Sequence, residues 1–203
     1  MSDIEPGAVL FDLFGVIARH QSEEGKALLV AAMGATDDPT AFWNAYWDLR
    51  LDYDRGGLDG PAYWRAVGDR LGLDVPLARI SALIEADIES WRAVDPEMVA
   101  LVERLASDGR TIGLLSNIPT ELADRFEKDN PWLAAFSVRA FSGRLGMAKP
   151  EPEVYLWCLD RMAVAPRETL FVDDRTENVA AAEALGLAGH VFTDRPALEA
   201  RLS

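Results

Sequence analysis

The sequence predicts an α/β protein with a Rossmann-like parallel sheet, helices on both faces of the sheet and an inserted helical cap subdomain. From about residue 95 onward, apolar strand-like runs alternate with helical patterns, which is typical of βαβ units in a parallel sheet. Between the first two strand-like runs lies a mainly helical stretch of roughly 80 residues, which is too long for a single crossover. We therefore expect a core made of residues 1–19 and 93–203 and a cap made of residues 20–92. A cap over the strand ends would exclude water from a site there.

The first half of the chain contains one strand and several helix starts. Residues 8–12 form the expected first strand, and helical patterns follow from about residue 20 to residue 91. Aspartate favours the N-cap of a helix, and proline favours its first position. Helix starts are therefore expected at Asp38-Pro39, at Asp59-Gly60-Pro61, where Gly72 ends the helix, and at Val75-Pro76.

The second half alternates between helices and strands. Asp95-Pro96 starts a helix that Gly109 ends, and strands are expected over residues 111–115, 138–141, 169–172 and 190–192. Helices are expected from about Pro119, over residues 152–162, and over residues 176–185, where Gly186 ends an alanine-rich segment. A short helix follows the last strand.

Composition and charge limit the partners. The 203 residues carry a formal net charge of -14, which argues against nucleic acid because phosphate backbones bind to basic faces. No apolar run approaches the roughly 18 residues that span a membrane, and residues 1–6 are acidic, unlike a signal peptide. Cys158 is the single cysteine, so an internal disulfide and a cysteine-zinc site are excluded. We expect a cytoplasmic protein that is a monomer or a homodimer.

Polar residues with catalytic potential follow three of the expected strands. Asp12 follows the first strand, Ser116-Asn117 follows the second, and Asp173-Asp174 follows the strand over residues 169–172. In an open parallel sheet, ligands bind beyond the carboxyl ends of the strands. These three ends, which are far apart in the sequence, are therefore expected to meet in one metal-assisted reaction centre.

Each of these groups also has a simpler interpretation. Asp12 is suited to act as a nucleophile or a Mg²⁺ ligand, but it could equally cap the turn after the strand. Ser116 and Asn117 could hold a phosphate at a helix N-terminus or serve only as an N-cap. Asp173 and Asp174 would repel each other without a cation, which favours a divalent metal over a solvated loop.

Lys149 lies in the segment Gly146-Met147-Ala148-Lys149-Pro150-Glu151-Pro152. The prolines stiffen this loop, so the ammonium group could be held where it neutralises a carboxylate or a bound phosphate. A solvated surface lysine is the alternative, although a lysine held between prolines is less expected in a chain this acidic.

Four short segments occur in the order Phe11-Asp12-Leu13-Phe14-Gly15-Val16-Ile17, Leu114-Leu115-Ser116-Asn117, Lys149-Pro150-Glu151-Pro152-Glu153-Val154-Tyr155 and Phe171-Val172-Asp173-Asp174-Arg175-Thr176-Glu177-Asn178-Val179-Ala180-Ala181-Ala182. Their order and spacing resemble the four motifs of the haloacid dehalogenase-like (HAD) hydrolase superfamily. The resemblance covers about residues 8–195 and is weakest in the cap. The most similar subgroup has a helical cap inserted after the first motif and includes sugar-phosphate phosphatases similar to bacterial glucose-1-phosphate phosphatase.

The resemblance implies Mg²⁺ as the cofactor and assigns its ligands. Asp12 matches both the nucleophile and a Mg²⁺ ligand, and the backbone carbonyl of Phe14 matches a second ligand. Asp174 matches the principal acidic ligand of the last motif. Asp173 matches a further ligand or a group that supports the ligands.

The second and third motifs imply the phosphate contacts. Ser116 and the adjacent amide of Asn117 match the phosphate-binding group, and Lys149 matches the lysine that neutralises charge. Asn178 occupies a position where many members carry another acidic residue.

Phe14 departs from the pattern of the superfamily's phosphatases, which usually have a general acid/base aspartate two residues after the nucleophile. Phenylalanine cannot transfer a proton. Haloacid dehalogenases also have an aromatic residue here, but they are metal-free and lack the acidic pair. Three functions therefore stay open. The first is a Mg²⁺-dependent phosphatase that hydrolyses a small phosphorylated metabolite through an aspartyl phosphate. The others are a metal-independent 2-haloacid dehalogenase and a weakly active protein that binds a phosphorylated ligand or a partner protein.

The expected cap carries many aromatic residues and two arginines of interest. The aromatic side chains are expected to form mainly the core of a helical bundle; they are Trp43, Tyr46, Trp47, Tyr53, Tyr63, Trp64 and Trp91. Arg50 and Arg55 are the candidate substrate contacts, because an arginine can bind a phosphate or carboxylate through two hydrogen bonds. The alternative for both is an ion pair with Asp52 or Asp54.

Overall fold

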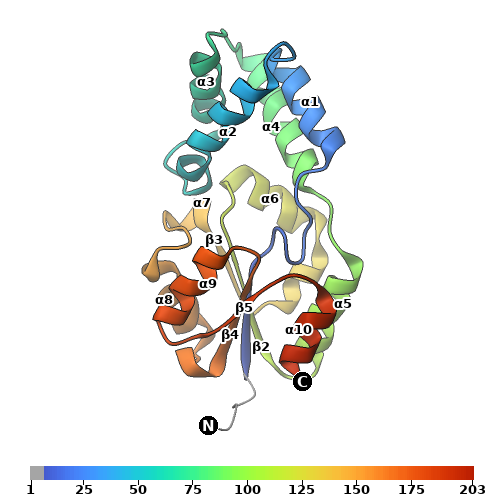
Figure 1. Ribbon diagram of the computed structural model, residues 1–203, viewed down its shortest axis with the longest axis vertical. Coiled ribbons are helices and arrows are strands. Elements are labelled where there is room, and N and C mark those ends of the chain that lie inside the picture. The colour runs from blue at the N-terminus through green and yellow to red at the C-terminus, as the bar shows by residue number, and fades with distance from the viewer. Residues whose placement is uncertain (1–6) are drawn as a thin grey trace.

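A five-stranded parallel sheet lies at the centre of the computed structural model, which describes residues 7–203 (Figure 1). The strands are β1 (Ala8–Phe11), β2 (Thr111–Ser116), β3 (Val138–Phe141), β4 (Thr169–Asp173) and β5 (Ala188–Val191). Their order is β3-β2-β1-β4-β5, and every neighbouring pair is parallel. The predicted fold class is confirmed. The acidic start of the chain, residues 1–6, lies outside the described residues.

Strand β5 begins earlier than the sequence predicts. The expected strand covered residues 190–192, but Ala188 already pairs with Leu170, and Gly189 pairs with Phe171. Alanine and glycine are poor strand formers, so Ala188 and Gly189 carry no local strand signal. A Cβ on Gly189 would overlap Val179, because helix α9 (Thr176–Ala184) packs closely on this strand. The close packing of α9 on β5 therefore requires a glycine at position 189, and this glycine is also the reason that the local sequence does not look like a strand.

Strand β1 is the point at which the connections of the sheet reverse direction. The chain runs from β1 to β2 and β3 on one side, and β4 and β5 then occupy the other side of β1. In an open α/β sheet, such a reversal opens a crevice at the carboxyl ends of the strands on either side of it. Asp12 follows β1, and Asp173 ends β4, so both lie at this crevice.

Helices cover both faces of the sheet, and β1 contributes side chains to both interfaces. The core helices are α5 (Pro96–Ser107), α6 (Thr120–Asp129), η1 (Pro131–Ala135), α7 (Ser142–Leu145), α8 (Pro152–Met162), η2 (Pro166–Glu168), α9 and α10 (Arg195–Leu202). Val9 and Phe11 pack toward α5, α6 and α10, whereas Ala8 and Leu10 pack toward α8 and α9. A strand buried on both faces is a rigid support for Asp12, the residue that follows it.

Four helices lie above the strand ends in Figure 1: α1 (Glu23–Met33), α2 (Pro39–Asp54), α3 (Gly60–Leu71) and α4 (Leu77–Trp91). Helices α2 and α3 begin where the sequence predicts, since Asp38 and Asp59 each accept a hydrogen bond from an N–H of the first turn. The four helices share an apolar core of their own, in which Tyr46, Tyr63 and Trp64 are fully buried. Within residues 7–203, no helix is long and apolar enough to cross a membrane.

Two chain segments connect these helices to the sheet, and they run side by side. The N–H of Arg19 donates to the carbonyl of Ala93 at 2.8 Å, and the N–H of Asp95 donates to the carbonyl of Ile17 at 2.9 Å. We propose that the boundary between core and cap falls in these paired segments, near residues 19–20 and 92–93.

The opposite edge of the cap touches the core directly. The N–H of Gly60 donates to Oε1 of Glu121 on α6 at 2.8 Å, and the hydroxyl of Ser142 on α7 donates to the backbone carbonyl of Asp54. Gly56 approaches the carbonyl of Gly143 so closely that a Cβ at Gly56 would overlap it. The cap is therefore docked on the core at both edges.

Candidate active site

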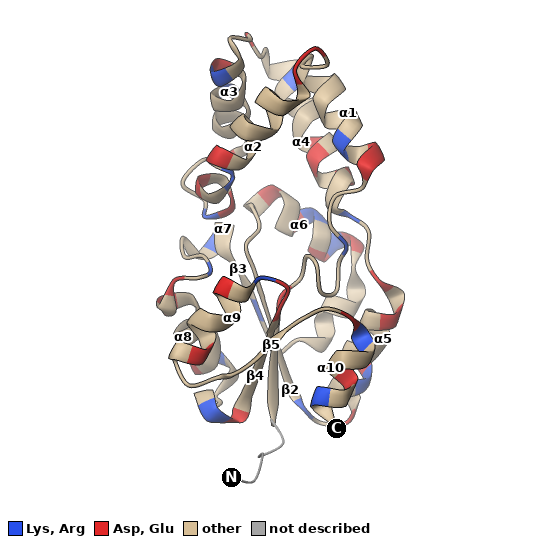
Figure 2. Cartoon of the chain, in the orientation of Figure 1, with Lys and Arg blue, Asp and Glu red and all other residues tan. Residues whose placement is uncertain are grey.

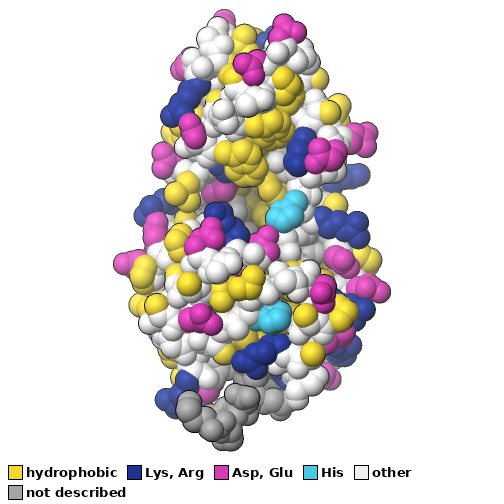
Figure 3. Space-filling view, viewed as in Figure 1, with side chains coloured by type: hydrophobic (Ala, Val, Ile, Leu, Met, Phe, Trp, Pro, Cys, Tyr) yellow, Lys and Arg dark blue, Asp and Glu magenta, His cyan; other side chains and the backbone are white. Residues whose placement is uncertain are grey.

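The carboxyl ends of the central strands open into one cavity between the sheet and the cap. Figure 3 shows a hollow between the upper and lower parts of the molecule, and Figure 2 shows that the acidic turn after β4 faces the cap. The cavity volume is about 420 Å³, within the range of about 300–1,000 Å³ typical of small-molecule sites. Its lining residues are Asp12, Phe14, His20, Trp47, Arg50, Leu51, Asp54, Trp91, Asn117, Lys149, Asp174, Arg175 and Asn178.

Lys149 connects two of the carboxylates. Its Nζ lies 2.7 Å from Oδ1 of Asp12 and 2.7 Å from Oδ2 of Asp173, and its side chain is buried. Burial opposes the charge of the ammonium group, but the two carboxylates outweigh it and raise the pKa of Lys149. Lys149 is therefore a fixed positive charge beside Asp12.

The side chain of Asn117 positions the loop that carries this lysine. Its Nδ2 donates to the carbonyl of Lys149 and its Oδ1 accepts from the N–H of Lys149, both at 2.9 Å. The sequence predicted that Asn117 contacts phosphate or caps a helix, and neither prediction includes this role. The missing signal is a pairing between residues 32 positions apart, which no local pattern encodes.

The two residues of the acidic pair are held differently. Asp173 is fully buried and accepts hydrogen bonds from Nζ of Lys149 at 2.7 Å and from Nδ2 of Asn178 at 3.1 Å. Asp174 lies 3.2 Å from Nε2 of His20 and lines the cavity. Asp173 therefore mainly holds Lys149 in place, whereas Asp174 offers its carboxylate to the cavity.

Gly15 allows the first motif to approach the acidic pair. Its φ is +82°, the left-handed region that glycine tolerates best. A Cβ at this position would overlap the carboxylate of Asp174 and the ring of His20. Glycine at this position therefore lets the turn after β1 lie directly against Asp174 and His20.

The residues at the strand ends fit a divalent cation. Asp12, Asp173 and Asp174 each place a carboxylate oxygen within 4.8 Å of the others. Burial raises the pKa of Asp12 to about 7 although Lys149 opposes the shift, and burial together with Asp173 raises the pKa of Asp174. A cation in addition to Lys149 would therefore stabilise the ionised form of both carboxylates. Carboxylate oxygens are also the ligands that Mg²⁺ prefers.

Ser116 contributes an unused hydroxyl. It is fully buried at the end of β2, and its Oγ has no hydrogen-bond partner among residues 7–203. A buried polar group left unsatisfied costs about 1–3 kcal/mol, so native structures usually pair such groups. A ligand oxygen bound at the end of β2 would satisfy it.

The ring of Phe14 lies in the aromatic part of the cavity wall. Its ring packs against Trp91 of the cap, with centroids 4.8 Å apart, and against Phe126 of α6, with centroids 5.9 Å apart. The position at which related phosphatases would carry an acid is therefore part of an aromatic contact between cap and core.

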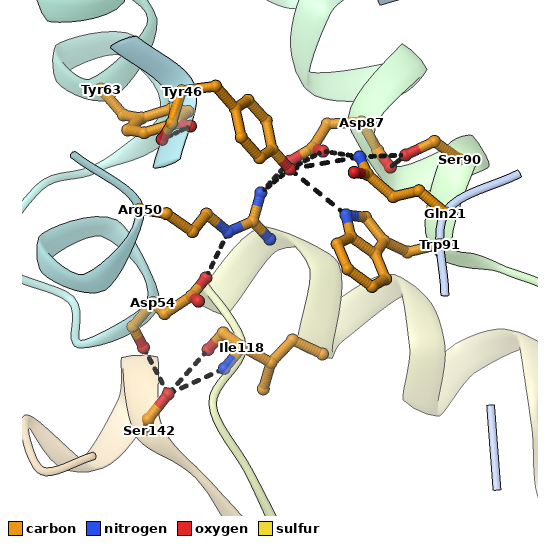
Figure 4. Close-up of polar contacts among 10 residues, drawn as sticks. All are labelled: Gln21, Tyr46, Arg50, Asp54, Tyr63, Asp87, Ser90, Trp91, Ile118 and Ser142. Atoms are coloured by element: carbon orange, nitrogen blue, oxygen red, sulfur yellow. Dashed lines mark hydrogen bonds and ion pairs between the residues drawn. The ribbon is translucent and has the colours of Figure 1, made fainter. Parts of the chain in front are cut away.

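Arg50 lines the cavity but its charge is already matched (Figure 4). Its Nε lies 2.7 Å from Oδ1 of Asp54, and its Nη1 lies 2.8 Å from Oδ2 of Asp87 on α4. Asp54 is one of the two ion-pair partners that the sequence offered as an alternative for Arg50, whereas Asp87 was not predicted. Burial raises the pKa of Asp54 to about 6 although Arg50 opposes the shift. Arg50 is buried, so it forms a part of the cap wall and not a surface ion pair.

Tyr46 completes this buried cluster (Figure 4). Its hydroxyl donates to Oδ1 of Asp87 at 2.7 Å and accepts hydrogen bonds from Arg50, from Gln21 at 3.2 Å and from Trp91 at 3.3 Å. The bonds join α2, α4 and the first connecting segment. The orientation of Arg50 and Trp91 in the cavity wall is therefore fixed from behind.

Arg55 lies outside the lining of the cavity. Its Nη1 lies 2.6 Å from Oε1 of Glu151, and its Nε donates to the carbonyl of Gly146 at 3.2 Å. Both partners flank the loop that carries Lys149. The structure thus places Arg55 between cap and core, away from the space beside Asp12.

This combination of a capped parallel sheet with a buried lysine among carboxylates at the strand ends defines a capped α/β hydrolase. The chain belongs to the haloacid dehalogenase-like hydrolase family, whose family model matches residues 6–186. The resemblance expected from the four motifs is confirmed, and the protein is a hydrolase.

Known proteins similar to this chain include phosphatases and dehalogenases. The sesquiterpene phosphatase astK of Aspergillus oryzae is 27% identical over 187 residues, which are 92% of this chain and 90% of astK. A HAD family enzyme of Bacteroides thetaiotaomicron, solved with magnesium and inorganic phosphate, has a TM-score of 0.74 at 21% identity and covers 94% of this chain and 98% of its own. The L-2-haloacid dehalogenase of Xanthobacter autotrophicus has a TM-score of 0.66 at 19% identity, covering 95% and 80%. At these identities, the two structures show a common fold.

Proposed function

We propose that this hydrolase is a Mg²⁺-dependent phosphatase of small phosphate monoesters that uses Asp12 as its nucleophile. The observation that carries the proposal is the buried Lys149 held between Asp12 and Asp173, with Asp174 within reach of both carboxylates. The similarity to a protein named as a phosphatase, and to an enzyme solved with magnesium and phosphate, supports the same reaction.

The hydrogen bonds of Asp12 indicate how it would attack phosphorus. The N–H of Leu13 and Nζ of Lys149 both lie on Oδ1, at 2.6 and 2.7 Å, so Oδ2 is the oxygen that neither group occupies. Attack of a carboxylate oxygen on the phosphoryl group would form an aspartyl phosphate and release the alcohol, and water would then hydrolyse the acyl phosphate. Lys149 and the free hydroxyl of Ser116 would stabilise negative charge on the phosphoryl oxygens.

Asp12, Asp174 and the carbonyl of Phe14 would hold Mg²⁺, which neutralises charge on the phosphate group. Mg²⁺ competes with a proton for the carboxylate of Asp12, whose pKa burial raises to about 7. We therefore expect the apparent Mg²⁺ affinity to rise about tenfold per pH unit up to pH about 7 and to level off above it. Mg²⁺ titrations of phosphate release across this range test the expectation.

The test of the function itself is phosphate release from a panel of phosphate monoesters with Mg²⁺ and with EDTA, using Asp12→Asn as the control. Activity that requires both Mg²⁺ and Asp12 is the expected result, and EDTA should leave only the background rate of the control. Circular dichroism in EDTA distinguishes loss of the metal from loss of the fold. Full activity in EDTA, or an Mg²⁺ affinity independent of pH, would contradict the assignment of Asp12 as a ligand.

Phe14 predicts a dependence of rate on the leaving group. A general acid typically contributes about 10²–10⁴-fold, and phenylalanine cannot supply this proton. We expect kcat/KM to fall about 10²-fold or more from phosphates with acidic leaving groups, such as aryl or sugar anomeric phosphates, to simple alkyl phosphates. A Brønsted series of aryl phosphates measures the slope. A flat series would mean that another group protonates the leaving oxygen.

The second candidate is a metal-independent 2-haloacid dehalogenase, which Phe14 favours because dehalogenases share an aromatic residue there. The clustered carboxylates of Asp12, Asp173 and Asp174 oppose it. Halide release from 2-chloropropionate in EDTA, absent in Asp12→Asn, would favour this candidate over the phosphatase.

A further inference from the structure

The cap contributes an apolar wall to the catalytic cavity. Six cap residues line the cavity, and three of them are apolar: Trp47, Leu51 and Trp91. Trp47 and Leu51 are 51% and 52% exposed although they are large hydrophobic side chains. They are one helical turn apart on α2, so they expose one continuous surface. Exposed apolar groups that join a deep pocket typically bind the apolar part of a ligand.

Aromatic rings continue this wall from the rim of the cavity toward Asp12. The rings of Trp47 and Trp91 have centroids 6.3 Å apart, and those of Trp91 and Phe14 have centroids 4.8 Å apart. Phe14 is two residues from Asp12. In Figure 3, apolar side chains form a strip that descends from the cap into the hollow between cap and core. The apolar surface therefore leads directly to the proposed nucleophile.

The two charged cap residues of the cavity leave no unmatched cation on this wall. Arg50 and Asp54 pair with each other at 2.7 Å, and Arg50 also pairs with Asp87 at 2.8 Å. One guanidinium thus faces two carboxylates. A second anionic group on a substrate would therefore find no unpaired cation on the cap wall.

We infer that the organic part of the substrate is an uncharged hydrocarbon group, aryl or long-chain, that lies along Trp47, Leu51 and Trp91. This inference rests on the proposed phosphatase function and names its substrate class. The phosphate binds at the polar floor beside Lys149 and Ser116, and the hydrocarbon extends to the rim. The wall therefore favours substrates that carry apolar area beside the phosphate.

The test is a series of 4-alkylphenyl phosphates whose alkyl chain grows from methyl to octyl. The leaving group keeps nearly the same basicity along the series, so the chain length reports only apolar contact. Burial of one methylene corresponds to about fourfold in affinity, and contact with an open wall to about twofold. We expect kcat/KM to rise two- to fourfold, approximately, for each methylene over the first several carbons. Chains of equal length in which ether oxygens replace methylenes should show little increase. A flat response to chain length would overturn the inference.

Matched leucine variants locate the effect on the wall. Leu51→Ala should reduce the gain per methylene, so that the ratio of wild-type to variant kcat/KM grows with chain length. Leu28→Ala is the control: Leu28 is 58% exposed on α1 and is not among the residues that line the cavity. It should follow the wild-type series at every chain length. Equal slopes for Leu51→Ala and Leu28→Ala would overturn the assigned surface.

A binding measurement separates this inference from the proposed function. Calorimetry of 4-alkylphenyl phosphonates with the Mg²⁺-loaded protein should show affinity that rises with chain length and a negative heat-capacity change. If no phosphate is hydrolysed but phosphonate affinity still rises, the phosphatase proposal fails and the apolar wall stands. If phosphates are hydrolysed and both series are flat, the wall fails and the phosphatase proposal stands.

Discussion

Asp12→Asn is expected to abolish multiple-turnover phosphate release, with a loss of about 10⁴-fold or more. The amide cannot form the acyl phosphate, and it also removes one oxygen ligand from the carboxylate cluster. Steady-state phosphate release with an aryl phosphate and saturating Mg²⁺ measures the loss. Retention of activity within about tenfold of wild type would exclude Asp12 as the nucleophile.

The same variant should fold as well as the wild type, which makes the loss interpretable. Burial already raises the pKa of Asp12 to about 7, so the ionised form is disfavoured by its surroundings near neutral pH. A neutral amide of the same shape avoids that penalty, and Lys149 retains Asp173 as a partner at 2.7 Å. Urea unfolding at neutral pH should therefore show little or no loss of stability.

Lys149→Met is expected to damage both activity and stability. The ammonium group lies 2.7 Å from two buried carboxylates, and its removal leaves both without their cation. Breaking a buried ion pair from one side typically costs about 3–5 kcal/mol in the free energy of unfolding. Activity should fall about 10³-fold, because the fixed charge beside the phosphoryl oxygens is lost.

The stability loss of Lys149→Met should depend on pH with a defined sign. Lys149 lowers the pKa of Asp12, so the variant raises that pKa above about 7, further from its ordinary value of 3.8. An acid whose pKa is raised on folding favours the folded state only while it is protonated. The deficit should therefore be small near pH 4 and should grow as the pH rises toward the raised pKa.

Urea unfolding of Lys149→Met and wild type at several pH values measures this deficit. Lys26→Met is the control, because Lys26 pairs with Glu23 on the exposed face of α1. Its effect should stay within about 0.5 kcal/mol, as is usual for surface pairs. A deficit of Lys149→Met that does not change with pH would mean that the two carboxylates do not control it.

The positions of the chemical groups could be predicted because the strand ends of a parallel sheet carry a local signature. Asp12, Asn117 and Asp174 each follow an apolar run, and the topology of the sheet brings those ends together. The helix starts at Asp38 and Asp59 were predicted on the same basis, since a cap residue acts on its own first turn. In each case, the residues next to one another in the sequence were sufficient to predict the position of the strand end or helix start.

The pairings between distant residues could not be predicted in this way. Asp87 meets Arg50 only because α4 packs beside α2 in the folded cap, and the two residues are 37 positions apart. One signal was present: Asp87 follows Ile80 and Leu83 on the buried face of α4, where a carboxylate requires a partner. Trp47 is an exception among the aromatic residues of the cap, most of which are buried as expected. It belongs to the aromatic set expected in the cap core, but about half of its surface is exposed on the cavity wall.

Asp54 contacts both the cavity wall and the core. Its carboxylate binds Arg50 in the cavity wall, and its backbone carbonyl accepts the hydrogen bond from Ser142 of the core. A ligand that contacts both this wall and the core would bind the docked cap more tightly than an undocked one, so ligand binding and docking would be thermodynamically linked. By reciprocity, docking strengthens ligand binding by the same factor by which the ligand strengthens docking. A substitution at the contact between Asp54 and Ser142 would therefore be expected to change ligand affinity as well as docking.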